Sequence, residues 1–422
     1  MRITQFLPTG KRFSDSLMPL LDELRQNSSE LAGIPVARLL NLFDDFGGKL
    51  LQHPETKTLD GVAFLSTWLR KSNLEGMLRM NLGGSPEFLD GFLPVGSVKL
   101  AAKPRGLVSM WMAGNVPTLP LFSLVQALSA KNVCMVKLAL ENQPGMIPLL
   151  TVLSQCEVAG LNGSTLFKFI AVVWFDYKYQ DLNEELSWAA DTKIMWGGGP
   201  ALKAISALPR REHCTEIAFG PKYSIGLLDR KRLERSEGFD NVISAFVRDI
   251  AAFDQRACSA PQTIFLEKNL RLSLRQVAEL FAHQFRRLPP KLSLDFYTTV
   301  RIINVRAEWA LDDQRDLIAS GPEANWTICM DSTISMKEAV QSRTIFLTEI
   351  DSWRQILSLI TPKIQSVGIA FGDPSDAEAF ANEATLRGVA RCVRPGLMNG
   401  FESPWDGKLL ISEVVRWVSL KG

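Results

Sequence analysis

The sequence predicts an α/β protein built on a doubly wound sheet, and three observations carry that prediction. From Gly106 onward, short apolar runs typical of strands alternate with amphipathic runs typical of helices. Glycine-containing turns stand between several strands and the helices that follow them. The chain has 422 residues, of which 46% are hydrophobic and 22% are charged, so it can bury a large core and divide into two domains.

The part of the chain before Gly106 shows a different pattern. Residues 1 to about 95 are expected to be helical and rich in loops, because apolar residues recur at helical spacing over 16–26 and 36–51. No residue pattern in this part indicates a chemical site. We interpret it as a segment that packs against the first domain.

The first winding is expected to start with a strand at 106–112, a turn at 113–117 and a helix at 119–131. A glycine turn at 197–199 precedes a second helix, which ends near residue 208. The later strands of this winding are expected at 132–138, 167–175, 192–196, 215–219 and 223–228.

A second α/β unit is expected after residue 228. A helix that ends at Asp254 leads to a strand that begins with Pro261. The remaining helices are expected at 271–288 and 297–311, and the remaining strands at 325–330, 343–350 and 366–372.

We predict three segments: a lead-in with a dinucleotide-binding domain over 1–228, a catalytic domain over 229–395, and a C-terminal segment over 396–422. Within the last segment, residues 407–422 alternate like a strand, and this strand is expected to return to the first domain or to join an oligomer interface.

Composition excludes several classes of function. The net charge is +2, from 47 basic and 45 acidic residues, and no block of like charge stands out, which argues against a nucleic-acid partner. No apolar run approaches the roughly 20 residues that span a bilayer, and the N-terminus lacks the apolar core of a signal peptide. We therefore expect a cytoplasmic protein without a membrane span.

Cysteine and histidine usage argues against metal sites and disulfides. The six cysteines are scattered and form no C-x-x-C pair, so a functional thiol is expected to act singly. Histidine occurs only at His53, His213 and His283. On a strand, His213 and Cys214 would point to opposite faces, and we expect no metal.

Three features of the first domain are candidates for a ligand site. Trp196, Gly197, Gly198 and Gly199 lie between a strand and a helix, where glycines let backbone N–H groups approach a phosphate, although such turns also occur without ligands. Lys137 ends a strand and could reach a ribose or phosphate, or could simply be solvated.

The third of these features is Asn115, which lies in the turn after the first strand of the winding. It is either a turn residue or an amide donor for a developing oxyanion.

Cys258 is the candidate nucleophile. It lies in a loop between a helix and a strand, where a thiol can be exposed and reactive, whereas Cys134 and Cys329 lie inside predicted strands and are expected to be buried. From the local sequence alone, Cys258 is either a nucleophile or a small apolar residue in a turn.

Several segments together resemble the long-chain fatty-acid reductases of bacterial luminescence. In chain order they are "AGNVP", "VKL", "WGGG", "FGPK" and "FDQRACSAPQ", followed near the end by "RGVARCVRPG" and "SPWDG". The resemblance covers about three quarters of the chain, and it depends on the order and spacing of segments that are weak individually. It implies an aldehyde-dehydrogenase-like fold: a doubly wound dinucleotide-binding domain, an α/β catalytic domain and a C-terminal oligomerising β segment.

The resemblance also implies roles for individual residues. Cys258 would be the acyl-accepting nucleophile, and Asn115 the side-chain amide of the oxyanion hole. Lys137 would contact the adenosine ribose or its phosphate, and Trp196 to Gly199 would form the phosphate-binding turn. The implied activity is reduction of an acyl thioester, carried by coenzyme A or a carrier protein, to an aldehyde with NADPH.

Two departures from the aldehyde dehydrogenase superfamily affect the expected chemistry. The hydrolytic members carry a water-activating glutamate four residues before a lysine, whereas here Glu216 stands six residues before Lys222 and Ala218 holds the matching position. Water attack on an acyl-enzyme should therefore be slow. No counterpart of the nicotinamide-ribose segment Glu-x-Phe-Gly-Pro is found.

NADPH is favoured over NADH because Leu140 stands three residues after Lys137, where NAD-preferring relatives often place a glutamate, although Glu141 is adjacent. The resemblance further implies an acyltransferase or acyl-protein synthetase as acyl supplier, and a homo-oligomer.

Alternative functions remain open at this point. One is an acyl carrier or subunit-assembly protein that keeps a dehydrogenase fold without turnover. Others are a hydrolytic NAD(P)-dependent aldehyde dehydrogenase and a Cys-His hydrolase that uses His283 or His213.

Overall fold

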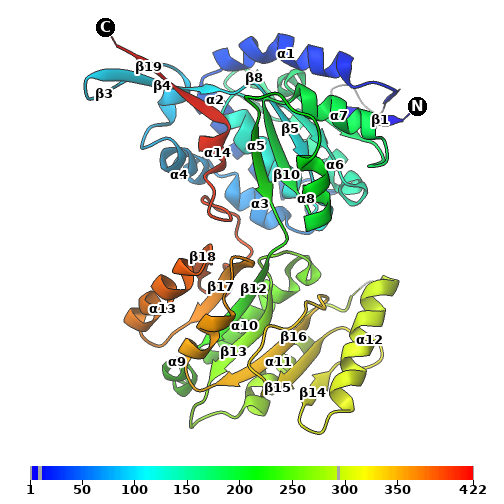
Figure 1. Cartoon of the computed structure of the whole chain (residues 1–422), viewed down its shortest axis with the longest axis vertical. Coiled ribbons are helices and arrows are strands. Elements are labelled where there is room, and N and C mark those ends of the chain that lie inside the picture. Colours follow the sequence, from blue (N-terminus) through cyan, green and yellow to red (C-terminus); the bar gives the residue numbers. More distant parts are fainter. Residues whose placement is uncertain (1, 8–11, 292–294, 422) are drawn as a thin grey trace. The chain divides into compact units, whose positions relative to one another are not determined.

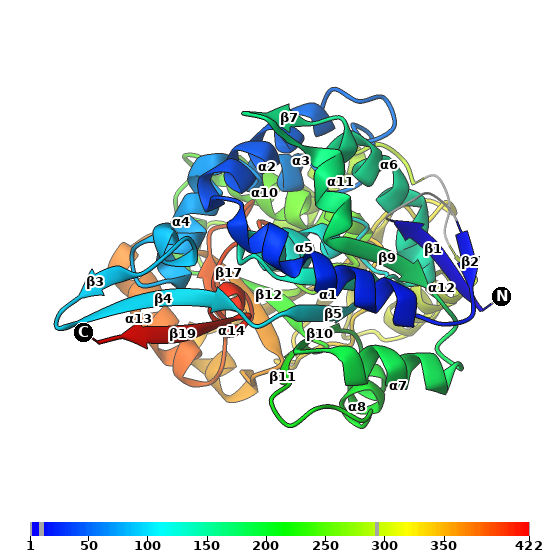
Figure 2. The ribbon, with the colours of Figure 1, turned by 90° about the horizontal axis from the view of Figure 1, so that it is seen from above.

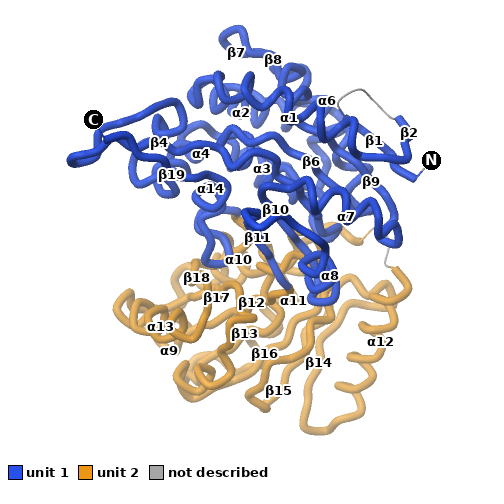
Figure 3. Tube along the Cα trace, turned by 45° about the horizontal axis from the view of Figure 1, so that its top comes forward, with its two compact units in different colours: residues 1–220, 401–422 blue, residues 221–400 orange. Residues whose placement is uncertain are grey.

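The computed structural model describes residues 2–7, 12–291 and 295–421. The chain divides into two compact units, Met1–Gly220 with Phe401–Gly422, and Pro221–Gly400 (Figure 3). In the described residues, each unit is built around one seven-stranded sheet, and elements are labelled in Figure 1 where there is room. The division into functional domains after residues 228 and 395 stays a prediction.

The first unit contains a mainly parallel sheet in the order β11-β10-β5-β6-β9-β1-β2. The five strands from β11 to β9 are parallel, whereas β1 runs antiparallel to β9 and β2 antiparallel to β1. The strands are β1 (Ile3–Leu7), β2 (Arg12–Ser14), β5 (Leu107–Trp111), β6 (Val133–Lys137), β9 (Ile170–Trp174), β10 (Thr192–Trp196) and β11 (Thr215–Phe219).

The winding of this sheet reverses at β5. The chain first moves outward through β5, β6 and β9, and then returns to the other side of β5 for β10 and β11. The connecting helices are α5 (Leu119–Ser129), α6 (Gln143–Ser154), α7 (Gln180–Ala189) and α8 (Gly199–Ser206). Strands covered on both faces need nearly continuous apolar sequence, and β5 and β10 are buried along their whole length. The predicted doubly wound sheet is confirmed.

The N-terminal region supplies helices to the first unit, as predicted. Helix α1 packs on β6 and β9, and α2 packs on α5 and α6. These helices are α1 (Met18–Gly33), α2 (Val36–Leu50), α3 (Val62–Trp68) and α4 (Lys71–Asn81). The prediction was incomplete, because β1, β2 and β3 (Leu93–Val95) also lie in this region. They are short, and β1 contains polar Thr4 and Gln5, so the sequence shows no extended apolar run.

The C-terminal strand pairs within its own chain. Strand β19 (Val415–Leu420) runs antiparallel to β4 (Val98–Pro104), which also pairs with β3 (Figure 2). The predicted strand over 407–422 is too long, because α14 (Leu410–Glu413) occupies its first part.

The second unit contains a sheet in the order β14-β15-β16-β13-β12-β17-β18, in which only β14 is antiparallel to its neighbour. Its strands are β12 (Tyr223–Leu228), β13 (Pro261–Glu267), β14 (Asp316–Ala319), β15 (Thr327–Asp331), β16 (Thr344–Ile350), β17 (Ile364–Ala370) and β18 (Arg391–Val393). Its helices are α9 (Arg230–Glu234), α10 (Phe239–Ala251), η4 (Ala252–Gln255), α11 (Leu274–Arg286), α12 (Phe296–Ala310), η5 (Trp353–Leu359) and α13 (Pro374–Leu386).

Alternate residues of the central strands of this sheet face two different cores. Ile264 and Leu266 of β13 pack with residues of α10 and α11, whereas Phe265 between them packs with residues of η5 and α13. On β12, Gly226 lies under Phe246 of α10, whose ring atom would come within 2.8 Å of any added Cβ. The helix can therefore approach the sheet only where a glycine stands.

Strand β12 corrects one expectation. Residues 223–228 were predicted to belong to the first winding, but β12 is a central strand of the second sheet, between β13 and β17. A buried parallel strand has the same apolar texture in either sheet, so the sequence of the strand does not say which sheet it joins.

Candidate active site

Three of the predicted site features lie along one edge of the first sheet. Trp111 at the end of β5 pairs with Lys137 at the end of β6 and with Met195 of β10. The residues that follow these parallel strands therefore share the carboxyl edge, at the point where the winding reverses. Open α/β sheets bind ligands at this position. Asn115, Lys137 and the turn from Trp196 to Gly199 are brought together there.

The glycine turn is open on its outer side. A Cβ added to Gly199 would meet nothing within 4 Å, and one on Gly197 would meet only the Cβ of Ala201 at 3.4 Å. Packing within the protein therefore does not explain why glycine occurs here. The missing side chains leave room for a ligand to approach the backbone, as a phosphate would.

Trp196 fixes this turn from the inside. Its indole N–H donates a hydrogen bond to Ser123 Oγ at 3.0 Å, and its ring stacks on Phe219 with centroids 3.9 Å apart. The side chain is buried. Trp196 thus anchors the turn to α5 and β11, and the groups that the turn can offer to a ligand are those of its backbone.

Among the described residues, no carboxylate forms an ion pair with the Lys137 ammonium. Its Nζ lies 4.8 Å from the centroid of the Phe175 ring, and it forms no hydrogen bond or ion pair with a described residue. Burial lowers the pKa of Lys137 to about 8, and the charge of Asp176 partly opposes this effect. An anionic group bound beside Lys137 would favour its protonated form.

Asn115 is exposed in the bend between β5 and α5. The preceding residue, Gly114, lies so close to the carboxylate of Glu141 that a Cβ at this position would overlap it. Glu141 is thereby directed toward the Gly114 turn. Its neighbour Leu140 is 60% exposed.

Cys258 lies in the second unit, in the turn between η4 and β13, at the amino edge of its sheet. The carbonyl oxygen of Cys258 accepts a hydrogen bond from Ser224 Oγ at 2.8 Å. The next residue, Ser259, donates from its hydroxyl to Asn399 Oδ1 at 2.8 Å, and Asn399 Nδ2 donates to the Asp249 carbonyl at 2.8 Å. Cys258 is partly exposed, and hydrogen bonds from Ser224 to its carbonyl and from Ser259 to Asn399 anchor the turn.

The other five cysteines are less suited to be nucleophiles. Cys134, Cys156, Cys214 and Cys329 are buried, whereas Cys392 is partly exposed like Cys258. Burial raises the pKa of Cys156, Cys329 and Cys392 to about 12 and raises the pKa of Cys134 and Cys214 as well. A thiolate is the reactive form, so burial suppresses the reactivity of all five.

The segment that leads to Cys258 corrects another expectation. Helix α10 ends at Ala251, and the predicted helix does not continue to Asp254. Instead Phe253, Asp254 and Gln255 have φ values of 53°, 48° and 64°. Such left-handed conformations cost non-glycine residues of order 1–3 kcal/mol each and persist only where surrounding contacts impose them. No feature of the sequence predicts them.

The residue considered as a hydrolytic base is engaged elsewhere. Glu216 on β11 accepts a hydrogen bond from the buried Lys193 Nζ at 3.1 Å and pairs with Arg210 at 2.8 Å. The two histidines considered for a hydrolase are exposed, and His213 lies 3.3 Å from Asp191. Among the described residues, no group of three or more His, Cys, Asp or Glu side chains could hold a metal ion.

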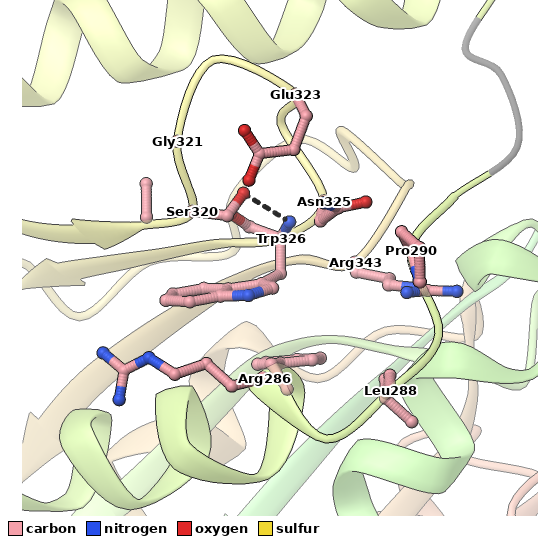
Figure 4. A pocket seen from close by; sticks show the side chains of 11 residues that line it. Arg286, Leu288, Pro290, Ser320, Gly321, Glu323, Asn325, Trp326 and Arg343 are labelled. Carbon is pink, nitrogen blue, oxygen red and sulfur yellow. Dashed lines mark hydrogen bonds between the residues drawn. The ribbon is translucent and has the colours of Figure 1, made fainter.

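A pocket of about 440 Å³ opens at the amino ends of β15 and β16 (Figure 4). Arg286 runs beneath the indole of Trp326, with its guanidinium 5.8 Å from the ring centroid, and Phe285 stacks on the same ring. Arg343 and Glu323 contribute the remaining charged side chains of the lining. No pattern in the sequence predicts this pocket, because its residues come from three separate loops and a helix end.

The family model for "Acyl-CoA reductase (LuxC)" matches residues 39–417. The chain belongs to this family. It is 27% identical over 361 residues to the long-chain acyl-protein thioester reductase of Aliivibrio fischeri, a match that covers 83% of this chain and 71% of the relative. The enzyme of the same description from Vibrio harveyi is 26% identical over 355 residues, with the same coverage. The predicted resemblance is confirmed.

Solved structures of aldehyde dehydrogenases share the fold. The glyceraldehyde-3-phosphate dehydrogenase GapN of Methanocaldococcus jannaschii, complexed with NADP, superposes with a TM-score of 0.71 at 11% identity, covering 99% of this chain and 97% of that chain. The aldehyde dehydrogenase KauB of Pseudomonas aeruginosa gives 0.71 at 13% identity, covering 98% and 91%. The predicted aldehyde-dehydrogenase-like fold is confirmed.

Sequence reasoning missed the residues that hold the Cys258 turn, namely Ser224, Asp249 and Asn399. Asn399 lies only a few residues after the segment "RGVARCVRPG", which carries part of the resemblance. Its contact with Ser259, 140 residues earlier in the chain, has no signal in a single sequence.

In the described part of the chain, no helix is long and apolar enough to cross a bilayer.

Proposed function

We propose that this member of the family reduces an acyl thioester to an aldehyde with NADPH, through a covalent acyl group on Cys258. One observation carries the proposal: within the family's motif, Cys258 is a partly exposed thiol on an anchored turn, whereas burial suppresses the other five thiols. Thioester exchange needs an accessible thiolate in a fixed position.

In the first step, the Cys258 thiolate attacks the thioester carbonyl. A bond forms between Sγ and the acyl carbon, the bond to the donor sulfur breaks, and the donor leaves as a thiol after taking up a proton. Asn115 is proposed to donate its side-chain amide to the oxyanion, together with a backbone N–H near Cys258. The support for Asn115 is its exposed position on the loop after β5 and its match to the family motif.

The residues at the carboxyl edge of the first sheet fit a dinucleotide. The open turn at Gly197, Gly198 and Gly199 would accept its pyrophosphate, and Lys137, which has no ion-pair partner among the described residues, would contact the adenosine ribose or a 2′-phosphate. When bound, NADPH supplies the hydride that reduces the acyl carbon. The hemithioacetal on Cys258 then collapses, which releases the aldehyde and restores the thiolate.

The preference for NADPH rests on the surroundings of Lys137. Leu140 is apolar and exposed, so it presents no charge that would repel a 2′-phosphate. Glu141, the nearest carboxylate in sequence, lies against Gly114. Titration with both cofactors tests this preference, and clearly tighter binding of NADH would overturn it.

Hydrolysis of the acyl group is expected to be slow. The position that matches the hydrolytic glutamate is Ala218, and Glu216 is held by Lys193 and Arg210. A carboxylate that is paired with two cations is a poor general base. The acyl group on Cys258 should therefore persist until it is reduced.

The acyl donor is proposed to be acyl-CoA or an acyl-carrier protein. The named relatives are long-chain acyl-protein thioester reductases, and by extension an acyltransferase or acyl-protein synthetase would supply the acyl group. We further propose a homo-oligomer that uses β19, because this strand is at the edge of its sheet and exposes Trp417 and Leu420.

Turnover assays distinguish this function from its alternatives. The protein is incubated with acyl-CoAs of several chain lengths and NADPH, while cofactor absorbance is followed and aldehyde is trapped. We expect aldehyde in proportion to the NADPH consumed. Release of free acid without cofactor oxidation would contradict the proposal, and stable acylation without any product would favour a carrier that does not turn over.

A further inference from the structure

Two strained segments of the second unit lie against each other beside the Cys258 turn. The first contains Phe253, Asp254 and Gln255, and the second contains Gln341, Ser342 and Arg343, with φ values of 67°, 54° and 55°. Six non-glycine residues thus adopt left-handed conformations in two runs of three. Strain of this kind is kept only where contacts over-determine it, and such sites are often functional.

Hydrogen bonds join the two segments along their backbones. The N–H of Ser342 donates to the Asp254 carbonyl at 3.0 Å. The Gln255 amide donates to the carbonyls of Thr344 at 2.9 Å and Pro261 at 2.9 Å, and its Oε1 accepts from the N–H of Thr344 at 2.8 Å. Gln255 is fully buried. It therefore ties the residues on both sides of Cys258 to the start of β16.

The side chain of Asp254 is the centre of the charged contacts between the segments. Its Oδ2 accepts from Ser342 Oγ at 3.0 Å, and its Oδ1 lies 3.3 Å from Arg343 Nε and 4.0 Å from Lys291 Nζ. The Arg343 contact is an ion pair without hydrogen-bond alignment, and neither atom has another hydrogen-bond partner among the described residues. The Arg343 and Lys291 cations thus share the Asp254 carboxylate as their counter-ion.

Lys291 connects this carboxylate to the strained backbone. Its Nζ donates to the Ser342 carbonyl at 2.6 Å, to the Ala324 carbonyl at 3.2 Å and to Ser342 Oγ. The side chain is only 5% exposed, and burial lowers the pKa of Lys291 to about 8. A buried ammonium needs a nearby anion, and Asp254 is the anion that faces it.

We propose that Asp254 is a positioning residue: through its ion pairs with Arg343 and Lys291 it holds the left-handed backbone that presents Cys258. Asp254 precedes Cys258 by only four residues. Gln255 anchors the chain between these two residues, and Ser259 anchors it directly after Cys258. Relaxation of the first segment would therefore displace the thiol. The inference rests on the proposed function in one respect, namely that Cys258 is the reacting group.

Asp254→Asn tests the charge while keeping the backbone preference, because asparagine tolerates positive φ. We expect the alkylation of Cys258 by iodoacetamide, followed by peptide mass spectrometry in the full-length protein, to slow about tenfold or more, since small displacements of a reacting group cost factors of this size. Cys392 in the same molecules controls for unfolding, because burial suppresses its alkylation in the folded protein and its alkylation should therefore stay slow. We expect kcat to fall in parallel, with the NADPH dissociation constant unchanged.

Asp312→Asn is the matched control variant, because Asp312 forms an ion pair with Arg315 at 3.1 Å in the same unit. Wild-type alkylation of Cys258 in Asp254→Asn would overturn the inference. An equal decrease in the rate of Cys258 alkylation in Asp312→Asn would also overturn the inference. Alkylation needs neither acyl donor nor cofactor, so a failure of the proposed function would be seen separately, as absence of acyl transfer in the unmodified protein.

Arg343→Gln provides a second route if Asp254→Asn does not fold. We expect it to slow Cys258 alkylation by a similar factor. Where both variants fold, the double variant should be no slower than Asp254→Asn alone, because Asp254→Asn already removes the ion pair with Arg343. Additive effects of the two substitutions, or an unchanged rate in Arg343→Gln, would contradict the role of the pair.

Discussion

The surroundings of single residues explain why similar side chains differ in chemistry. Cys258 and Cys392 are both partly exposed, but burial raises the pKa of Cys392 to about 12. Lys137 and Lys193 both lie on strands of the first sheet, but Lys193 is paired with Glu216, whereas Lys137 lies over the Phe175 ring and forms no ion pair with a described residue. The shift that burial causes in the thiol pKa and the partners of the ammonium therefore decide which thiol and which cation can act.

Asn115→Ala tests the proposed oxyanion contact. Removing one such donor typically lowers the rate roughly 100- to 1,000-fold, so we expect kcat to fall by about this factor in the aldehyde assay. The dissociation constant for NADPH should change little. Asn241→Ala, at an exposed asparagine of α10 in the other unit, is the control. A kcat close to that of the wild type would remove Asn115 from the mechanism.

Asp249 predicts a dependence of stability on pH. It is 2% exposed, and burial raises its pKa to about 6, although the N–H of Gly396 donates to its carboxylate. The folded protein thus holds the proton more tightly than the unfolded chain. The contribution of Asp249 to the free energy of unfolding is complete below a pH of about 4 and is lost as the pH rises through about 6. The stability lost over this range is about 3 kcal/mol.

Thermal unfolding of Asp249→Asn measures this contribution. The melting temperature of the wild type, relative to that of the variant, should fall as the pH is raised from about 4 to about 7. Groups that titrate elsewhere affect both proteins and cancel in the difference. A difference that does not change over this range would show that Asp249 titrates alike in the folded and unfolded states.

Secondary structure elements place these residues, and the sequence predicted some placements better than others. The strand ends that carry Lys137 and the glycine turn follow from apolar runs that stop at a turn, so their common edge was predictable. The left-handed conformations of Phe253, Asp254 and Gln255 before Cys258 were not predictable. Ser342 and Thr344, which are far away in the sequence, hold this segment. Local propensity cannot report such contacts.

Gly199→Ala tests the phosphate-binding turn. A Cβ at this position meets no atom within 4 Å, so thermal stability should be unchanged, whereas a pyrophosphate against the backbone would meet the new methyl group. We expect the dissociation constant for NADPH to rise about tenfold, or about 1.4 kcal/mol. Gly33→Ala, where space is also open, is the control. Unaltered NADPH binding in Gly199→Ala would argue against this turn as the site.

At the scale of the whole molecule, the order of weak motifs indicated the family, and the aldehyde dehydrogenase fold followed from it. Single-sequence patterns failed where a strand could belong to either sheet. Residues 223–228 are apolar and follow shortly after β11, yet they pair with β13 and β17. Neither this pairing nor the packing of Gly226 under Phe246 is visible in the sequence.

The proposed oligomer gives a prediction at this scale. Leu420 on β19 is 49% exposed at the edge of the three-stranded sheet. If β19 joins subunits, Leu420→Lys should lower the molar mass measured by light scattering, because a charge would be buried at the interface. Leu386→Lys, at an 85% exposed residue of α13, should leave the mass unchanged. The same mass for both variants and the wild type would argue against β19.

Intact-mass spectrometry after incubation with an acyl-CoA, without any nicotinamide cofactor, tests the central claim most directly. We predict that one acyl group adds to the wild-type protein and to Cys392→Ala, which controls for the other partly exposed thiol, and that no acyl group adds to Cys258→Ala. An adduct that persists in Cys258→Ala, or a wild-type protein that gains no acyl group, would contradict the account.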